Sequence, residues 1–341
     1  MTAPLFDRIR WIDPISGQPL TPVVVSRTPS GVPIHGAMRI GETNRAYPIV
    51  DCVVRATPEA ARKYAQWLEP LGLALPEEGG SFQEEATVES FGFQWAWTAE
   101  MRNEDDLRWR VASRFEVDPS EFADKTVLDA GAGAGDQSRW MLRRGADVVS
   151  IDLSAAIEVV ASKLRLESNW VGVQGDITAL PFAGDQFDLV YCEGVIQHTR
   201  DSAATVRELL RVLAGGGRIL ATHYPKPENF LGKIRVGALN ALRRRLTRME
   251  RYKLLFVSGL LAMSAYIPLT GWLVRRFGLA IHQPEMPRFQ TTWTNTFDMY
   301  GNHAYQRVLT GDTFWSYFRA AGAEQVYRAG TTVVARKKNG S

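Results

Sequence analysis

The chain has 341 residues, 45% of them hydrophobic and 23% charged, which is long enough for an α/β core with one or two smaller modules. Its 40 basic and 37 acidic residues give a net charge of +3, so no strong overall field requires nucleic acid as a partner. Cys52 and Cys192, the two cysteines, exclude a disulfide framework, and the stretch "MTAPLFDRIRWIDP" lacks the apolar run of a signal peptide, so we expect a cytoplasmic protein.

Two segments precede the core. Residues 1–57 are rich in Pro, Gly, Thr and Val without helical periodicity, which predicts a small β and turn module. Residues 58–125 form a predicted helical extension: "PEAARKYAQWLEPLG" has helical spacing that stops at Gly72, and "RWRVASRFEVDPSEFADK" predicts a helix and a turn.

Residues 126–225 alternate between strand and helix signals. The runs "TVLDAG", "DVVSIDLS", "WVGVQGD", "FDLVYCEG" and "RILATHY" are short and almost continuously apolar, as buried parallel strands are. Helical segments separate them, which predicts an α/β fold.

The stretch "VLDAGAGAGD" places Gly131, Gly133 and Gly135 directly after the first of these strands. Such a turn presents backbone N–H groups and lets a nucleotide lie against the chain. The dinucleotide pattern G-x-G-x-x-G fails, because glycine would be needed where the chain has Asp136 or Ser138, and this disfavours an oxidoreductase.

Acids end three successive strands. Asp129 can reach an amino group over the turn, Asp152, which Leu153 follows, can accept hydrogen bonds from ribose hydroxyls, and Asp176 can take an adenine amino group while Ile177 packs on the ring. Because the carboxyl ends of parallel strands meet at one edge, these acids converge. The alternative interpretation is ordinary turn and cap chemistry.

These motifs, with "VQGDITALPFAGDQFDLVYCEGVIQHT" and "ELLRVLAGGGRIL", resemble those of the class I S-adenosylmethionine-dependent methyltransferases, whose sheet is Rossmann-like and seven-stranded. The resemblance implies that S-adenosylmethionine is the cofactor: Gly131, Gly133 and Gly135 contact its methionine part, Asp152 its ribose, Asp176 and Ile177 its adenine, and Glu193 lines the floor. Residues 289–338 resemble the C-terminal helix and hairpin, joined near Ala329 and Gly330, whose antiparallel last strand completes that sheet.

Two further stretches, "ESFGFQWAWTAEM" and "NTFDMYGNHAYQRVLTGDTFWSYFRAAG", resemble a bacterial subgroup of this family. In that subgroup the first residues often form a small zinc ribbon. Here the cysteines are missing, and the four residues that stand in their places do not favour tetrahedral zinc: Asp13, Ser16, Ile40 and Thr43. We therefore expect a degenerate ribbon held by packing, without a metal.

Methyl transfer from a sulfonium needs alignment, exclusion of water and, for some acceptors, a base. His198 in "GVIQHT" is the candidate base, with a turn cap as the alternative interpretation. The acceptor side is expected to include the following residues: Gln94, Trp95, His223, Tyr224, Asp298, Tyr300, His303, Tyr305 and Gln306.

Residues 226–288 insert two or three helices where a minimal methyltransferase has none, and we expect them to form a lid for a small-molecule or lipid-linked acceptor. Residues 254–274 carry no charge, which predicts either helices split near Pro268 or a membrane helix with basic flanks, so that residues 243–276 would contact a membrane surface. The sequence "YCEG" matches neither motif of nucleic-acid methyltransferases, so no nucleic acid is expected.

Two functions remain open from the sequence. The favoured one is an S-adenosylmethionine-dependent methyltransferase of a biosynthetic pathway. The other is a catalytically silent protein of the same fold that binds the cofactor and a partner. Acceptor-dependent turnover distinguishes them.

Overall fold

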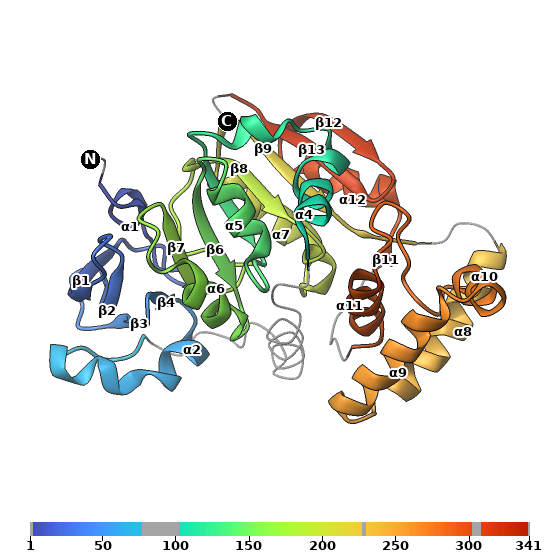
Figure 1. Cartoon of the computed structure of the whole chain (residues 1–341). Coiled ribbons are helices and arrows are strands. Elements are labelled where there is room, and N and C mark those ends of the chain that lie inside the picture. The colour runs from blue at the N-terminus through green and yellow to red at the C-terminus, as the bar shows by residue number, and fades with distance from the viewer. Residues whose placement is uncertain (1–2, 77–101, 227–229, 302–307, 340–341) are drawn as a thin grey trace.

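A mixed sheet forms the centre of the computed structural model, which describes residues 3–76, 102–226, 230–301 and 308–339 (Figure 1). Its eleven strands within these ranges follow the order β1 (Leu20–Arg27), β2 (Pro33–Ile40), β3 (Ala46–Val50), β4 (Val53–Arg55), β7 (Trp170–Gln174), β6 (Asp147–Asp152), β5 (Thr126–Ala130), β8 (Phe187–Cys192), β9 (Leu213–Thr222), β13 (Thr332–Lys337) and β12 (Ala323–Ala329). The expected α/β class is confirmed.

The expected number of seven strands is wrong for the sheet as a whole. Strands β7, β6, β5, β8 and β9 are parallel, and β13 lies antiparallel between β9 and β12, which accounts for seven strands with an antiparallel last strand. The sheet continues because β4 pairs in parallel with β7, with Val54 opposite Val173. The N-terminal strands thus extend the sheet instead of folding apart from it.

Side chains alternate between two cores. In β5, Leu128 faces the core shared with α7 (Ser202–Val212) and α12 (Gly311–Ala320), whereas Val127 faces the core shared with α4 (Glu104–Val111) and α5 (Asp136–Leu142). The helix α6 (Ala156–Leu164) covers β4 and β7 through Val160 and Trp170. Burial on both faces explains the continuous apolar runs.

The glycine-rich segment before "RIL" belongs to strand β9, which begins directly after α7 at Leu213. Phe187 of β8 pairs with Leu213, but Leu189 pairs with Arg218, so the residues between form a bulge. Gly216 has φ +75°, which explains the glycine at that position.

The N-terminal module contains α1 (Leu5–Arg8) and β1–β4, and α2 (Pro58–Lys63) follows it. The longer helix expected up to Gly72 is wrong: α2 ends at Lys63, and two short 3₁₀ turns follow, the second with Pro70 in its first turn. The side chain of Asp13 accepts hydrogen bonds from Ser16 and from the Tyr47 hydroxyl, 2.8 Å away. Hydrogen bonds to Asp13 therefore fasten the turn at residues 13–16 to β3, and the kinship to a zinc ribbon stays a prediction.

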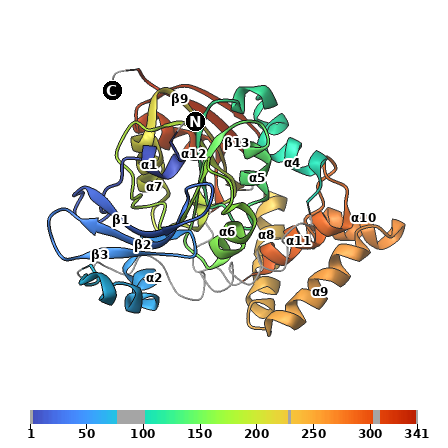
Figure 2. The ribbon, with the colours of Figure 1, turned by 60° about the vertical axis from the view of Figure 1, so that its left-hand side comes forward.

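Three helices form the insertion: α8 (Phe230–Leu246), α9 (Arg251–Ser264) and α10 (Pro268–Phe277). They stand at one side of the sheet, opposite the N-terminal module, and meet α11 (Phe289–Tyr300) (Figures 1 and 2). The short strands β10 (Tyr224–Pro225) and β11 (Val308–Leu309) pair beside them. The expected split near Pro268 is confirmed, and whether the insertion acts as a lid stays a prediction.

In the described part of the chain, no individual helix has both the length and the apolar character to cross a membrane. Helices α9 and α10 satisfy that criterion only when taken together, and a bend of 114° separates them.

Candidate functional site

Three acids lie at the carboxyl edge of the sheet, on neighbouring strands. Asp129 stands near the end of β5, Asp152 ends β6, and Asp176 follows β7 by two residues. Their side chains are buried. Because β7, β6 and β5 are adjacent, the structure brings together the acids that the sequence analysis singled out.

Asp152 fastens the glycine turn to the end of β6. It accepts a hydrogen bond from the Gly133 N–H at 2.9 Å and two from Ser154, at 2.9 and 2.7 Å. Burial raises the pKa of this carboxyl against those hydrogen bonds. A carboxylate offers about four acceptor positions, so it retains capacity for hydroxyl donors.

Asp176 has one satisfied and one unsatisfied oxygen. Its Oδ1 accepts from the Thr178 N–H and hydroxyl, at 2.8 and 2.7 Å. Its Oδ2 is buried without a hydrogen-bond partner among the described residues, and burial raises the pKa of the group. A buried acceptor of this kind fits a donor from a ligand. Ile177 beside it is buried, and Leu153 is half-buried.

Asp129 is paired with a hydroxyl. Ser138 of α5 donates to its Oδ2 at 2.5 Å, and Ser150 of β6 lies 2.8 Å from that hydroxyl. Burial raises the pKa of Asp129 to about 7, although the Ser138 hydrogen bond opposes this. Its charge therefore changes within the physiological range.

The three glycines of the turn all have positive φ, at 88°, 52° and 76°. A Cβ on Gly131 would lie 2.3 Å from Val195, and one on Gly135 would lie 2.7 Å from Val160. At these two positions the protein's own packing requires glycine, in addition to any ligand.

Glu193 lies inside a cluster of arginines. Its Oε1 is 2.7 Å from Arg110 and 2.5 Å from Arg114, and its Oε2 accepts from the Tyr191 hydroxyl at 2.8 Å. Burial alone would raise the pKa of Glu193, but the arginines outweigh it and lower the pKa to about 2. Glu193 is therefore a fixed anion.

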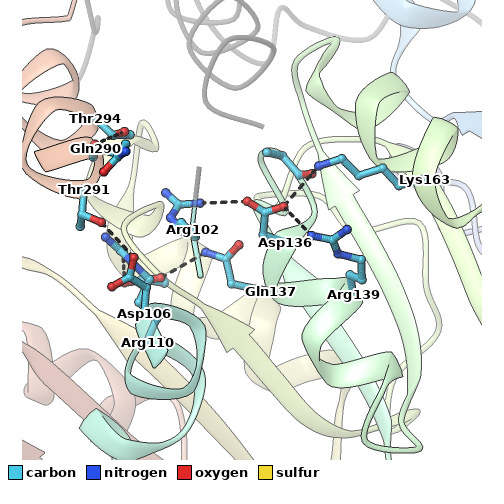
Figure 3. Close-up of polar contacts among 12 residues, drawn as sticks. Arg102, Asp106, Arg110, Asp136, Gln137, Arg139, Lys163, Gln290, Thr291 and Thr294 are labelled. Carbon is cyan, nitrogen blue, oxygen red and sulfur yellow. Dashed lines mark hydrogen bonds and ion pairs between the residues drawn. The ribbon is translucent and has the colours of Figure 1, made fainter. Parts of the chain in front are cut away.

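The start of α5 faces a second set of charges (Figure 3). The Asp136 carboxylate is 3.9 Å from Arg102, 3.2 Å from Lys163 and 3.8 Å from Arg139. Figure 3 shows Arg102 reaching toward Asp136, with Gln137 pointing between α5 and α4. The amide of Gln137 donates to Glu193 at 3.4 Å, so the two clusters are joined.

Helix α11 closes this region from the insertion side. Thr291 donates to Asp106 of α4 at 3.0 Å (Figure 3). Arg110 donates to Asn295 of α11 at 3.2 Å. The arginine that holds Glu193 thus also contacts α11.

His198 meets two groups from other elements. Its ring lies edge-on to Tyr224, with centroids 5.5 Å apart, and the Tyr224 hydroxyl donates to Asp298 of α11 at 2.7 Å. Burial and Asp298 together raise the pKa of Tyr224. The structure therefore brings together His198, Tyr224 and Asp298.

Two other acceptor candidates have partners of their own. The His223 ring is 4.8 Å from that of Phe314, and burial lowers its pKa. Tyr300 is fully buried, and its hydroxyl donates to the Leu279 carbonyl at 3.0 Å. The remaining candidates lie outside the described residues: Gln94, Trp95, His303, Tyr305 and Gln306.

Sequence reasoning missed the arginines. Arg110 and Arg114 are four residues apart, so they lie on the same face of a helical turn. Glu193, an acid at the end of a strand, could have been proposed as the partner of both. That signal was present in "RWRVASR". No sequence pattern indicated the role of Arg102, because Arg102 and its partner Asp136 are far apart in sequence and meet only in the folded chain.

Comparisons with known proteins agree with this geometry. Residues 128–221 match the family model described as "Methyltransferase domain". That range contains the three acids, Glu193 and His198. The chain therefore contains a methyltransferase domain, and the expectation of one is confirmed.

Curated relatives cover the same part. The chain is 36% identical over 124 residues to demethylmenaquinone methyltransferase of Clavibacter sepedonicus, which covers 36% of this chain and 50% of that protein. It is 38% identical over 129 residues to ubiquinone biosynthesis O-methyltransferase of Psychrobacter cryohalolentis, covering 36% and 49%. The chain thus spans about half the length of the curated relatives it matches.

Among solved structures, the chain is similar to the 1,6-didemethyltoxoflavin-N1-methyltransferase of Burkholderia thailandensis, whose structure contains 1,6-didemethyltoxoflavin and S-adenosylhomocysteine. The TM-score is 0.43 at 13% identity, with 78% of this chain and 94% of that chain covered.

Proposed function

We propose that this protein is an S-adenosylmethionine-dependent methyltransferase that acts on a small-molecule or lipid-linked acceptor. The observation that carries the proposal is the row of Asp129, Asp152 and Asp176 on three neighbouring parallel strands, inside the segment that matches the methyltransferase family. Strand ends at one sheet edge are where α/β folds bind nucleotides. The names of the curated relatives, which include two quinone-pathway enzymes, support a biosynthetic role.

The residues present fit the proposed methyl donor. The unpartnered Oδ2 of Asp176 suits an adenine amino group, and Ile177 is placed to pack on the ring. Asp152 has acceptor capacity for the ribose hydroxyls. Asp129 and the glycine turn would hold the amino-acid part, and Glu193 would line the floor of the site. When bound, the donor supplies a methyl group on a positively charged sulfur.

The acceptor step needs alignment and, for a hydroxyl or protonated amine, removal of a proton. His198 is the base in our proposal. Tyr224, fixed by its hydrogen bond to Asp298, packs against the His198 ring with the two ring planes nearly perpendicular. The charge of Glu193 stays constant through the step, because the pKa of Glu193 is far below neutral pH.

Calorimetric titration with S-adenosylmethionine and S-adenosylhomocysteine tests donor binding. We expect the native protein to bind both, and Asp176→Ala to weaken binding by about tenfold or more through loss of a buried hydrogen bond. The matched control is Asp105→Ala, an exposed acid in the first turn of α4. Absence of binding by the native protein would remove the basis of the proposal.

Turnover with a radiolabelled methyl donor and a set of phenolic and quinol acceptors then separates the enzyme from a silent binding protein. We expect His198→Gln to lower kcat by about a hundredfold while donor affinity is unchanged. The control is His35→Gln, since His35 stacks on Trp67 in the N-terminal module. Equal kcat values for the native protein and His198→Gln would show that proximity alone suffices.

A further inference from the structure

The outer side of α9 and α10 is apolar and exposed. Its members recur every three or four residues along α9 and continue through Ile267 onto α10, and their exposed fractions run from 42% to 78%. We call this surface the α9–α10 face; its residues are Tyr252, Phe256, Leu260, Met263, Ile267, Leu269, Trp272, Leu273 and Phe277. Exposed apolar surface of this extent is typical of a binding site.

The opposite side of α9 is already used in packing. Leu254, Ser258 and Ala262 are buried, and the indole N–H of Trp293 in α11 donates to the Leu255 carbonyl at 3.0 Å and to Ser258 at 3.2 Å. Gly259 lies against the same indole. The helix is therefore apolar on both sides, and core packing accounts for only one of them.

Positive charge surrounds this face. Residues 243–277 contain eight basic residues and one acid, Glu250, whereas the whole chain has a net charge of only +3. Seven of the basic residues are exposed and flank the uncharged stretch: Arg244, Arg245, Arg248, Arg251, Lys253, Arg275 and Arg276. The charge of this surface complements an anionic partner.

The bend between the helices favours a position in the plane of a membrane. The fourteen residues of α9 rise about 21 Å, less than the roughly 30 Å of a hydrocarbon core. Internal hydrogen bonds hold the 114° bend: Thr270 donates to the Ser264 carbonyl at 2.9 Å, and Arg275 donates to the Ala265 carbonyl.

We propose that the α9–α10 face docks onto the surface of an anionic lipid bilayer. The apolar side chains enter the boundary between headgroups and acyl chains, and the flanking arginines and lysine meet the headgroups. Exposed Tyr252 and Trp272 are of the aromatic types that favour this boundary. A second copy of the chain is disfavoured as occupant, because two faces with the same positive charge repel.

Vesicle flotation of the full chain tests the proposal without any methyl donor, so its outcome is independent of the proposed activity. The vesicles contain either phosphatidylcholine alone or equal parts of phosphatidylcholine and phosphatidylglycerol. We expect the native protein to float with the anionic vesicles and the double variant Phe256→Gln/Trp272→Gln to bind them about tenfold more weakly. We expect Arg244→Gln/Arg248→Gln to lose the preference for anionic lipid.

The matched control is Leu166→Gln, a residue that is 67% exposed after α6, far from this face, and that should leave vesicle binding unchanged. Thermal unfolding of each variant shows whether it is folded. Failure of the native protein to float with anionic vesicles would overturn the proposal. So would equal loss in Leu166→Gln, or a native dimer in sedimentation that Phe256→Gln/Trp272→Gln dissociates.

Discussion

At the scale of single residues, the four acids of the site differ because their surroundings differ. Asp176 keeps one buried oxygen without a partner, Asp152 is held by backbone and hydroxyl donors, and Asp129 has a single hydroxyl partner for its Oδ2. Glu193 is held by arginines. With a pKa of about 7, the carboxyl of Asp129 changes its charge near neutrality, whereas Glu193, with a pKa of about 2, stays ionised there.

The pKa of Asp129, about 7, predicts that donor binding depends on pH. A cationic amino group binds the ionised carboxylate better than the neutral acid, so affinity should rise from about pH 6 to about pH 8, with proton release at neutral pH. Calorimetry in two buffers of different ionisation enthalpy measures that release. In Asp129→Asn the pH dependence should disappear, and an unchanged profile would contradict the assignment.

The same shift affects folding, with a definite sign. Because the folded pKa is raised above the ordinary value of 3.8, the folded state holds the proton more tightly. The stabilisation that the folded state gains by holding this proton is fully present when the pH is below the ordinary carboxyl pKa, and it is lost as the pH rises through about 7. Denaturant titrations across that range measure it.

Glu193 is expected to be essential for stability. Glu193→Gln leaves Arg110 and Arg114 buried without their carboxylate, so we expect the free energy of unfolding to fall by about 3 kcal/mol or more. The matched control is Glu121→Gln, whose ion pair with Arg218 is partly exposed and should contribute less than about 1 kcal/mol. Urea unfolding compares the two, and equal losses would contradict the expectation.

At the scale of elements, α11 joins the insertion to the core. Its Trp293 packs on α9, while Thr291 and Asn295 contact Asp106 and Arg110 of α4. The sequence analysis assigned this helix to the C-terminal segment, but its contacts tie it equally to the insertion.

The packing of α9 on α11 gives a prediction. A Cβ on Gly259 would lie 3.0 Å from the Trp293 indole, so Gly259→Leu should separate the helices and lower the free energy of unfolding by about 1–3 kcal/mol. On α8, Gly237 has open space around it, so Gly237→Leu should be neutral or stabilising through helix propensity. Thermal unfolding distinguishes them, and similar effects would contradict the packing.

Local patterns predicted the elements of the core well. The apolar runs and the acids at their ends indicated β5, β6 and β7, and Pro268 indicated the break between α9 and α10. Partners distant in sequence could not be predicted in the same way. The ion pair between Arg102 and Asp136 and the contact of His198 with Tyr224 depend on how the elements pack, which periodicity does not record.

At the scale of the whole molecule, the N-terminal module is part of the central sheet. Strand β4 pairs with β7, and Arg55 is fully buried, donating to Gln174 at 2.8 Å and to Glu158 at 3.2 Å. Trp11 of the module also packs on Phe182, with ring centroids 5.3 Å apart. The sequence analysis missed this continuity because β4 has only three residues.

We therefore expect the full chain to show one calorimetric transition that covers the module and the core together. A chain that lacks residues 1–57 should unfold at a lower temperature and aggregate, because the edge of β7 becomes exposed. Two separate transitions, or an unchanged transition of the core after the deletion, would contradict the continuity of the sheet.

Within the described residues the sheet ends at β1 and β12, and each of these strands is irregular. In β1 the pairing with β2 skips Val25, and Pro22 lacks an N–H; in β12 the register shifts between Glu324 and Tyr327, where Gln325 has φ +49°. An edge strand whose row of unpaired N–H and C=O groups is interrupted pairs poorly with a strand of another chain. Its outermost strands thus protect this long sheet against growth by strand addition, which matters most when many copies gather at high local concentration.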